Sequence, residues 1–188
     1  MRRFLLGPAG LFTGFLWGFA EATLFFIIPD VFLTLAALFS IKQSLKIMAA
    51  ILLGSVLGGG VMFWIGAAHP EQAESLVLHV PFITQKMVAK SHDEFEQYGI
   101  WALVKGPAGG IPYKIYAVQS PRRAGLPVFL LVTVIARAWR FVLAWAFAVL
   151  MGAVFKKGID HRPWAAVAAH LLLWTAIYAW YWSKVLHG

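Results

Sequence analysis

The 188-residue sequence contains no cysteine and few charged residues. Without cysteine the protein cannot form disulfides, use thiolate catalysis or hold cysteine-ligated zinc or iron–sulfur centres. Asp, Glu, Lys and Arg make up only 13% of the chain, whereas the surface of a soluble domain carries roughly 25–35% of these residues. The chain is 61% hydrophobic with a mean hydropathy of +0.75. Lipid is therefore expected to replace water around much of the protein.

The net charge of +8 is spread between apolar stretches and forms no dense basic patch. This distribution favours phospholipid head groups over nucleic acid as the anionic partner. The six histidines show no metal-ligand spacing, and no G-x-S-x-G motif is present. We therefore expect no metal, no cofactor and no enzymatic activity. The apolar run that follows Arg3 is longer than a signal peptide and is expected to belong to the mature protein.

The first apolar stretch, from about residue 4 to residue 39, is interrupted only by Glu21 and by Pro29-Asp30. A straight helix of this length would measure about 50 Å, against a hydrocarbon core of about 30 Å. The stretch is too long for one crossing and too short for two. We predict a re-entrant hairpin that bends between Glu21 and Asp30. The alternative is one tilted or kinked span preceded by an interfacial helix.

A second apolar stretch, from about residue 99 to residue 120, contains the breaker-rich sequence Gly106-Pro107-Ala108-Gly109-Gly110-Ile111-Pro112. No continuous helix crosses a bilayer with such a centre. Irregular backbone at membrane depth persists only where protein or a water-filled cavity covers it. The pattern predicts a second re-entrant segment.

The remaining apolar stretches are typical of transmembrane helices. They cover residues 45–68, 126–155 and 164–186. In the first of them, Gly54 and Gly58 have the spacing that lets helices approach closely, either within one subunit or between two in a homo-oligomer. The polar region from residue 69 to residue 98 holds five of the eight acidic residues, and its loose helical periodicity predicts one amphipathic helix on the membrane surface.

These elements predict an all-α, multi-pass integral membrane protein with a single domain over residues 1–188. A broken segment followed by a span occurs twice, which suggests an inverted repeat with the two re-entrant hairpins on opposite faces. The core of this domain extends over about residues 10–155, followed by the last transmembrane helix. The distribution of basic residues favours a cytoplasmic N-terminus, because seven fall on the side of the N-terminus and five on the opposite side. The two sets are Arg2, Arg3, Lys42, Lys46, Lys156, Lys157 and Arg162 on that side, and Lys86, Lys90, Arg122, Arg123 and Lys184 on the other.

Glu21 and Asp30 are the acidic residues of the apolar regions. A charge at mid-bilayer costs at least about 2.5–3.5 kcal/mol, so each should face a partner or water, or be protonated. The functional interpretation is a proton-titrating carboxylate beside a substrate path. The alternatives are a salt bridge or, for Asp30, an N-cap before Val31.

Arg137 and Arg140 are three residues apart on a predicted helix and therefore share one face. The arginine fork stays charged when buried and matches a phosphate or carboxylate. The pair therefore predicts an anion-binding site, and the alternative is that each arginine neutralises Glu21 or Asp30.

Lys105 and Lys114 flank the breaker-rich loop. Unwound backbone and helix ends offer partial positive charge to an anion. We expect the loop around Gly110 and Pro112, together with Lys114, to contribute to the same anion site. For Lys105, extension toward the membrane interface is the favoured interpretation.

Taken in order, these motifs resemble the DedA family, whose shared core is the VTT or SNARE-associated domain. The resemblance covers roughly residues 10–155. The matching stretches are Gly18-Phe19-Ala20-Glu21-Ala22-Thr23 through Pro29-Asp30, Gly54 to Gly66, Lys105 through Lys114, and Ile135-Ala136-Arg137-Ala138-Trp139-Arg140-Phe141. In place of the family's R-F-x-P-G-x-R loop pattern the chain has Gly-Gly-Ile-Pro-Tyr-Lys, as in a short subgroup, so Lys114 would replace the second loop arginine.

The resemblance implies a lipid transporter of the bacterial inner membrane that moves a phospholipid or a polyprenyl phosphate and depends on protons. Glu21 and Asp30 would be its acids, and Arg137 and Arg140 its essential basic pair. Two alternatives stay open on the residues themselves. One is a proton-coupled exporter of small cationic solutes that uses the acids as its substrate site. The other is a membrane assembly factor without transport activity.

Overall fold

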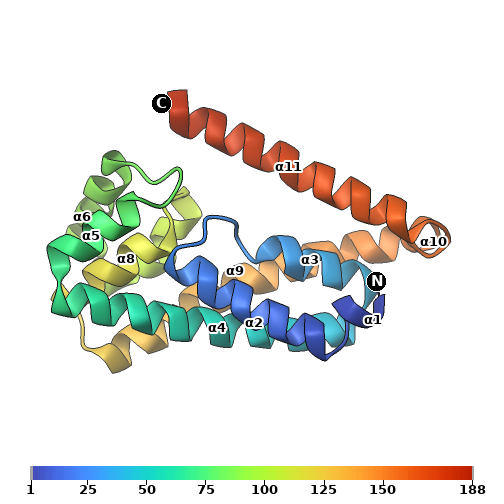
Figure 1. The fold of residues 1–188 in the computed structure, drawn as a ribbon, viewed down its shortest axis with the longest axis horizontal. Coiled ribbons are helices and arrows are strands. Elements are labelled where there is room, and N and C mark those ends of the chain that lie inside the picture. Colours follow the sequence, from blue (N-terminus) through green and yellow to red (C-terminus); the bar gives the residue numbers. More distant parts are fainter. Residues whose placement is uncertain (1, 188) are drawn as a thin grey trace.

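The computed structural model describes residues 2–187, and within this range the chain is helical with no strand. The predicted all-α fold is confirmed. Three of the described helices are long and apolar enough to cross a membrane. They are α4 (Ile41–Ala68), α9 (Leu126–Val154) and α11 (Pro163–His187). Each lies within a few residues of a predicted span, and α4 and α9 run side by side along the long axis (Figure 1).

The first broken segment folds back on itself. After the short α1 (Arg2–Leu5), α2 (Pro8–Thr23) runs toward one end of the molecule and α3 (Asp30–Phe39) returns (Figure 1). Pro8 suits the first turn of α2 because that position needs no N–H donor. The predicted bend between Glu21 and Asp30 is confirmed by the non-helical residues 24–29. Its depth in a bilayer stays a prediction.

The polar region forms two helices, α5 (Pro70–Leu78) and α6 (Gln85–Tyr98), so the prediction of one amphipathic helix is wrong. The chain turns between them because Phe82 has a positive φ of 67° and the Thr84 hydroxyl accepts the Met87 N–H at 3.3 Å, which starts α6 anew. Apolar side chains of both helices are buried against the core.

The second broken segment is more fragmented than the first, as its glycines and prolines predict. Gly110 adopts a φ of +86°, a conformation that glycine reaches without strain, and Pro112 then leads into α8. The two broken segments therefore differ in local structure, and the inverted repeat stays a prediction. The pieces are η1 (Gly99–Trp101), α7 (Ala102–Lys105), η2 (Gly106–Gly109), α8 (Tyr113–Gln119) and η3 (Ser120–Arg122).

The basic residues that the sequence assigns to opposite membrane faces belong to elements at opposite ends of the molecule (Figure 1). The N-terminus, the start of α4 and the short α10 (Lys156–His161) share one end. Helices α5 and α6 lie at the other end, where the C-terminal half of α11 also points. The long helices therefore run along the axis expected of a membrane protein.

Helices α2 and α4 pack with their backbones in close contact, as the Gly54 and Gly58 spacing predicts. A Cβ atom at Gly54 would collide with the Phe15 carbonyl of α2, and one at Gly18 would collide with the Ile51 backbone of α4. The glycines therefore serve packing within one subunit, which brings Glu21 of α2 against α4 and α9.

Gly54→Ala should destabilise the protein by about 1–3 kcal/mol, because its methyl group must push the α2 backbone away. Gly60→Ala on the same helix is the matched control, since a Cβ there meets only Leu130 Cδ2 at 3.8 Å. The control should be neutral or slightly stabilising, because alanine is the better helix former. Unfolding of both variants in detergent measures the difference, and equal stabilities would contradict this packing.

Candidate functional site

The charged residues predicted for the site come together where the two broken segments meet α9. Four of them are almost fully buried in a chain with few charges. Their exposed fractions are 4% for Glu21, 3% for Asp30, 2% for Lys114 and 1% for Arg137. Burial of so many ionisable groups in an apolar protein requires that each find a partner or serve a ligand.

Arg137 and Glu21 form a buried ion pair between α9 and α2. The Arg137 Nη2 donates to the Glu21 carboxylate and, at 3.1 Å, to the Ser55 hydroxyl of α4. The rings of Tyr113 and Phe141 flank the guanidinium at 4.9 and 5.0 Å. Within residues 2–187, the Nε and Nη1 of Arg137 have no hydrogen-bond partner. Arg137 therefore keeps unused donor capacity deep inside the protein.

Arg140 pairs with Asp30 at 3.1 Å, one helical turn further along α9. Asp30 is the first residue of α3 and Pro29 occupies the N-cap position, so the N-cap alternative for Asp30 is wrong. The Arg140 side chain is 22% exposed, and its buried Nε has no partner among the described residues. This second pair lies nearer the surface than the first.

Lys114 differs from the arginines because no carboxylate of the described residues lies within salt-bridge distance of it. Its ammonium donates to the Phe25 carbonyl at 3.0 Å, which ties α8 to the loop of the first broken segment. A lysine has three N–H donors, so this single bond leaves capacity for a ligand. Lys105, by contrast, is exposed and lies over the Tyr98 ring at 3.6 Å, outside the site.

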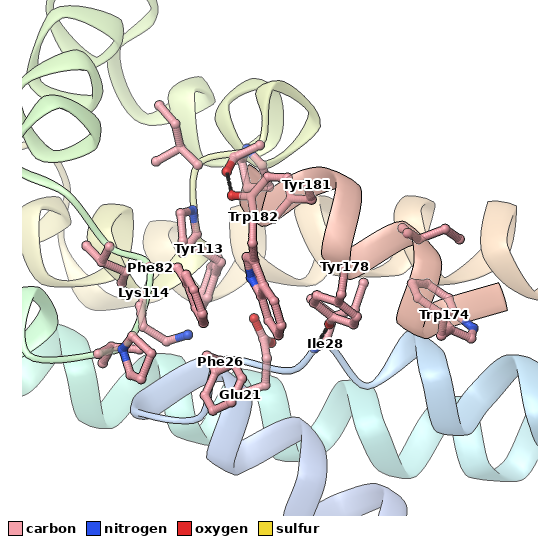
Figure 2. A pocket seen from close by; sticks show the side chains of 18 of the residues that line it. Glu21, Phe26, Ile28, Phe82, Tyr113, Lys114, Trp174, Tyr178, Tyr181 and Trp182 are labelled. Carbon is pink, nitrogen blue, oxygen red and sulfur yellow. Dashed lines mark hydrogen bonds between the residues drawn. The ribbon is translucent and has the colours of Figure 1, made fainter. Parts of the chain in front are cut away.

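A cavity of about 250 Å³ opens beside these groups. Glu21, Lys114 and Arg140 line it, as do Gly110 and Pro112 of the second broken segment. Figure 2 shows the Glu21 carboxylate and the Lys114 ammonium directed into it. Arg137 and Asp30 do not line the cavity but each is paired with a residue that does. The structure thus brings all seven predicted site residues into one place.

The sequence did not predict that α11 covers this cavity. The sequence predicts only that this segment spans the membrane, yet Trp174, Tyr178 and Tyr181 line the cavity wall. The Tyr178 hydroxyl accepts the Ile28 N–H at 2.7 Å, and the Tyr181 hydroxyl donates to the Gly110 carbonyl at 2.7 Å (Figure 2). Helix α11 therefore holds both broken segments. Their four- and three-residue spacing puts these aromatic residues on one helix face, but it does not distinguish a face toward lipid from a cavity wall.

Tyr113, at the start of α8, is a further residue that the sequence did not predict at the site. It is 1% exposed, lies against Arg137 and shares a hydrogen bond of 2.9 Å with the Thr133 hydroxyl. A Cβ at Gly59 would collide with the Tyr113 hydroxyl, so this glycine leaves room for the ring.

The site as a whole has more positive than negative charge. Two arginines and Lys114 face two carboxylates, which leaves one positive charge when all five groups are ionised. Within residues 2–187, all three basic side chains keep N–H donors without a hydrogen-bond partner. The arrangement suits an anion that accepts hydrogen bonds, such as a phosphate or carboxylate.

Three long apolar helices enclosing buried ion pairs fit the class of helical membrane proteins. The chain is 28% identical over 155 residues to an uncharacterised protein of Haemophilus influenzae, and the match covers 79% of each chain. No family model matches the sequence, and no solved structure matches it. The resemblance to the DedA family stays a prediction.

Proposed function

We propose that the protein is a lipid transporter, a flippase or scramblase that moves a lipid with an anionic head group across the bacterial cytoplasmic membrane. The observation that carries the proposal is the cavity between the two broken segments, which Lys114 and Arg140 line with an excess of positive charge over Glu21. Non-helical backbone on two sides of a cavity that charged side chains line is the arrangement by which transporters hold ions and head groups. The resemblance to DedA proteins supports a phospholipid or polyprenyl phosphate as the substrate.

The pairing of Glu21 with Arg137 supports proton coupling as part of the proposal. Protonation of Glu21 would release the Arg137 fork, whose Nε and Nη1 have no hydrogen-bond partner within residues 2–187. A phosphate could then take the place of the carboxylate. Asp30 and Arg140 form a second pair to which the same exchange applies. The protein would therefore take up a proton together with the head group.

Transport of a fluorescent phosphatidylglycerol between the leaflets of proteoliposomes tests the proposal. Lys114→Gln should lower the initial rate by about 10- to 100-fold, because a hydrogen bond to a charged group contributes about 1.5–3 kcal/mol. Lys105→Gln is the matched control and should transport at the wild-type rate. Equal rates for the two variants, or no transport by the wild type under a proton gradient of either direction, would overturn the proposal.

A second candidate function, export of a small cationic solute, is favoured by the aromatic wall of α11. The rings of Trp174, Tyr178 and Tyr181 line the same cavity as Glu21 (Figure 2), and aromatic faces bind organic cations. Thermal protection separates the two candidates. A long-chain alkyl phosphate should raise the unfolding temperature if the site binds anions, and tetraphenylphosphonium should do so if it binds cations.

A further inference from the structure

A second cavity of about 550 Å³ lies between α3, α9, α10 and α11. Its size falls within the range of about 300–1,000 Å³ that is typical of ligand pockets. Its walls are almost entirely apolar and include Leu38 of α3, Met151 of α9 and Leu173 of α11. Small residues, Ala144 and Ala166 among them, leave the space open. We call this cavity the apolar groove.

The apolar groove adjoins the cavity of about 250 Å³ that Glu21, Lys114 and Arg140 line, which we call the charged cavity. Trp174 and Ile177 of α11 line both spaces. On α9, Arg140 lines the charged cavity and Ala144, one turn further on, lines the groove. On α3, Thr34 of the groove follows Asp30 by one turn. Both helices therefore pass from a charged end to an apolar end in the same direction.

The few polar side chains of the groove are already bonded within the protein. The Trp174 indole N–H donates to the Thr34 hydroxyl at 3.2 Å, and that hydroxyl bonds the Asp30 carbonyl at 2.6 Å. The His170 Nε2 lies 3.0 Å from the Val31 carbonyl. With these groups occupied, the groove offers hydrocarbon surface to an occupant.

We propose that the apolar groove binds the hydrocarbon chain of the lipid whose anionic head group occupies the charged cavity. The inference rests on the proposed function for the nature of the head group. A charged space of about 250 Å³ joined to an apolar one of about 550 Å³ matches the two parts of an anionic lipid. Helix α11 covers both spaces, so it would hold head group and chain together.

The test uses vesicles of phosphatidylcholine that contain a trace of phosphatidic acid with a photoreactive diazirine at the end of one acyl chain. After illumination, labelled peptides are identified by mass spectrometry. We expect label in the groove, at Met151 and Leu173, in preference to Leu143, which is exposed on another part of α9. The same diazirine on phosphatidylcholine should label the groove far less, because it brings no anionic head group.

Ala144→Phe should cut groove labelling by about tenfold or more, since each buried methylene contributes about fourfold to binding and the ring excludes several. Ala146→Phe, exposed two residues further on and outside the groove, should leave labelling unchanged. If Ala144→Phe does not fold, Ala166→Phe fills the groove from α11, with the exposed Ala168→Phe as its control.

Label spread evenly over α9, equal groove labelling by both lipids, or labelling that survives a folded groove-filling variant would each overturn the inference. These results are independent of transport. Specific labelling without movement of lipid between leaflets would keep the groove as a lipid site and reject the transporter. Transport with diffuse labelling would keep the transporter and reject the groove.

Discussion

Glu21→Gln is expected to lower the free energy of unfolding by about 3–5 kcal/mol, the cost of leaving a buried charge without its partner. The glutamine amide cannot neutralise the Arg137 guanidinium, which is 1% exposed and has two further donors without partners among the described residues. Arg137→Gln should lower the free energy of unfolding by a similar amount, because it leaves the buried Glu21 carboxylate without its partner. Reversible unfolding of the purified protein in detergent measures both.

The double variant Glu21→Gln/Arg137→Gln should lose clearly less stability than the sum of the two single variants, because it removes both charges together. Lys156→Gln is the control for loss of an exposed pair. Lys156 bonds Asp160 at 2.9 Å with 73% of its side chain exposed, and its loss should change stability by less than about 1 kcal/mol. Additive losses at Glu21 and Arg137 would contradict a coupled buried pair.

The same double variant separates folding from transport. If the Glu21 carboxylate carries the coupling proton, the folded double variant should move no lipid in response to a proton gradient. Gradient-dependent transport at the wild-type rate would exclude Glu21 from proton coupling. It would also show that its pair with Arg137 is structural only.

Tyr113→Leu has the second large expected effect, about 2–4 kcal/mol of stability. The substitution keeps an apolar side chain but removes the ring that lies 4.9 Å from the Arg137 guanidinium. A desolvated cation–π contact contributes about 2 kcal/mol, and the Thr133 hydroxyl loses its partner at a further cost of about 1–2 kcal/mol. Thermal or chemical unfolding in detergent gives the difference.

Two comparisons resolve the contributions at Tyr113. Tyr113→Phe keeps the ring and loses only the bond to Thr133, so it should cost about 1 kcal/mol. Tyr98→Leu removes a ring from the exposed Lys105, where the contact is worth about 0.5–1 kcal/mol. If Tyr113→Leu costs no more than Tyr98→Leu, the aromatic ring does not stabilise the buried arginine.

Several features of the fold follow from the sequence because they depend on local or compositional physics. The scarcity of charge requires a lipid-facing exterior, and the lengths of the three apolar runs set the three long helices. The bend before Asp30 falls at Pro29, and the break at Gly110 falls in a run of seven residues that combines two prolines with three glycines. The break between α5 and α6 could not be predicted from hydropathy, because no hydropathy pattern encodes the positive φ of Phe82.

The sequence by itself determined which residues are chemically out of place in lipid: Glu21, Asp30, Lys114, Arg137 and Arg140. Desolvation cost alone singles them out, since each would be expensive unless partnered. Their pairing was decided only by the tertiary structure, because it depends on how α2, α3 and α9 lie against one another. The position of α11 is the clearest case. Its tyrosines carry no mark in the sequence that distinguishes an interface anchor from a cavity wall, and only contacts with Ile28 and Gly110, far away along the chain, place them at the site.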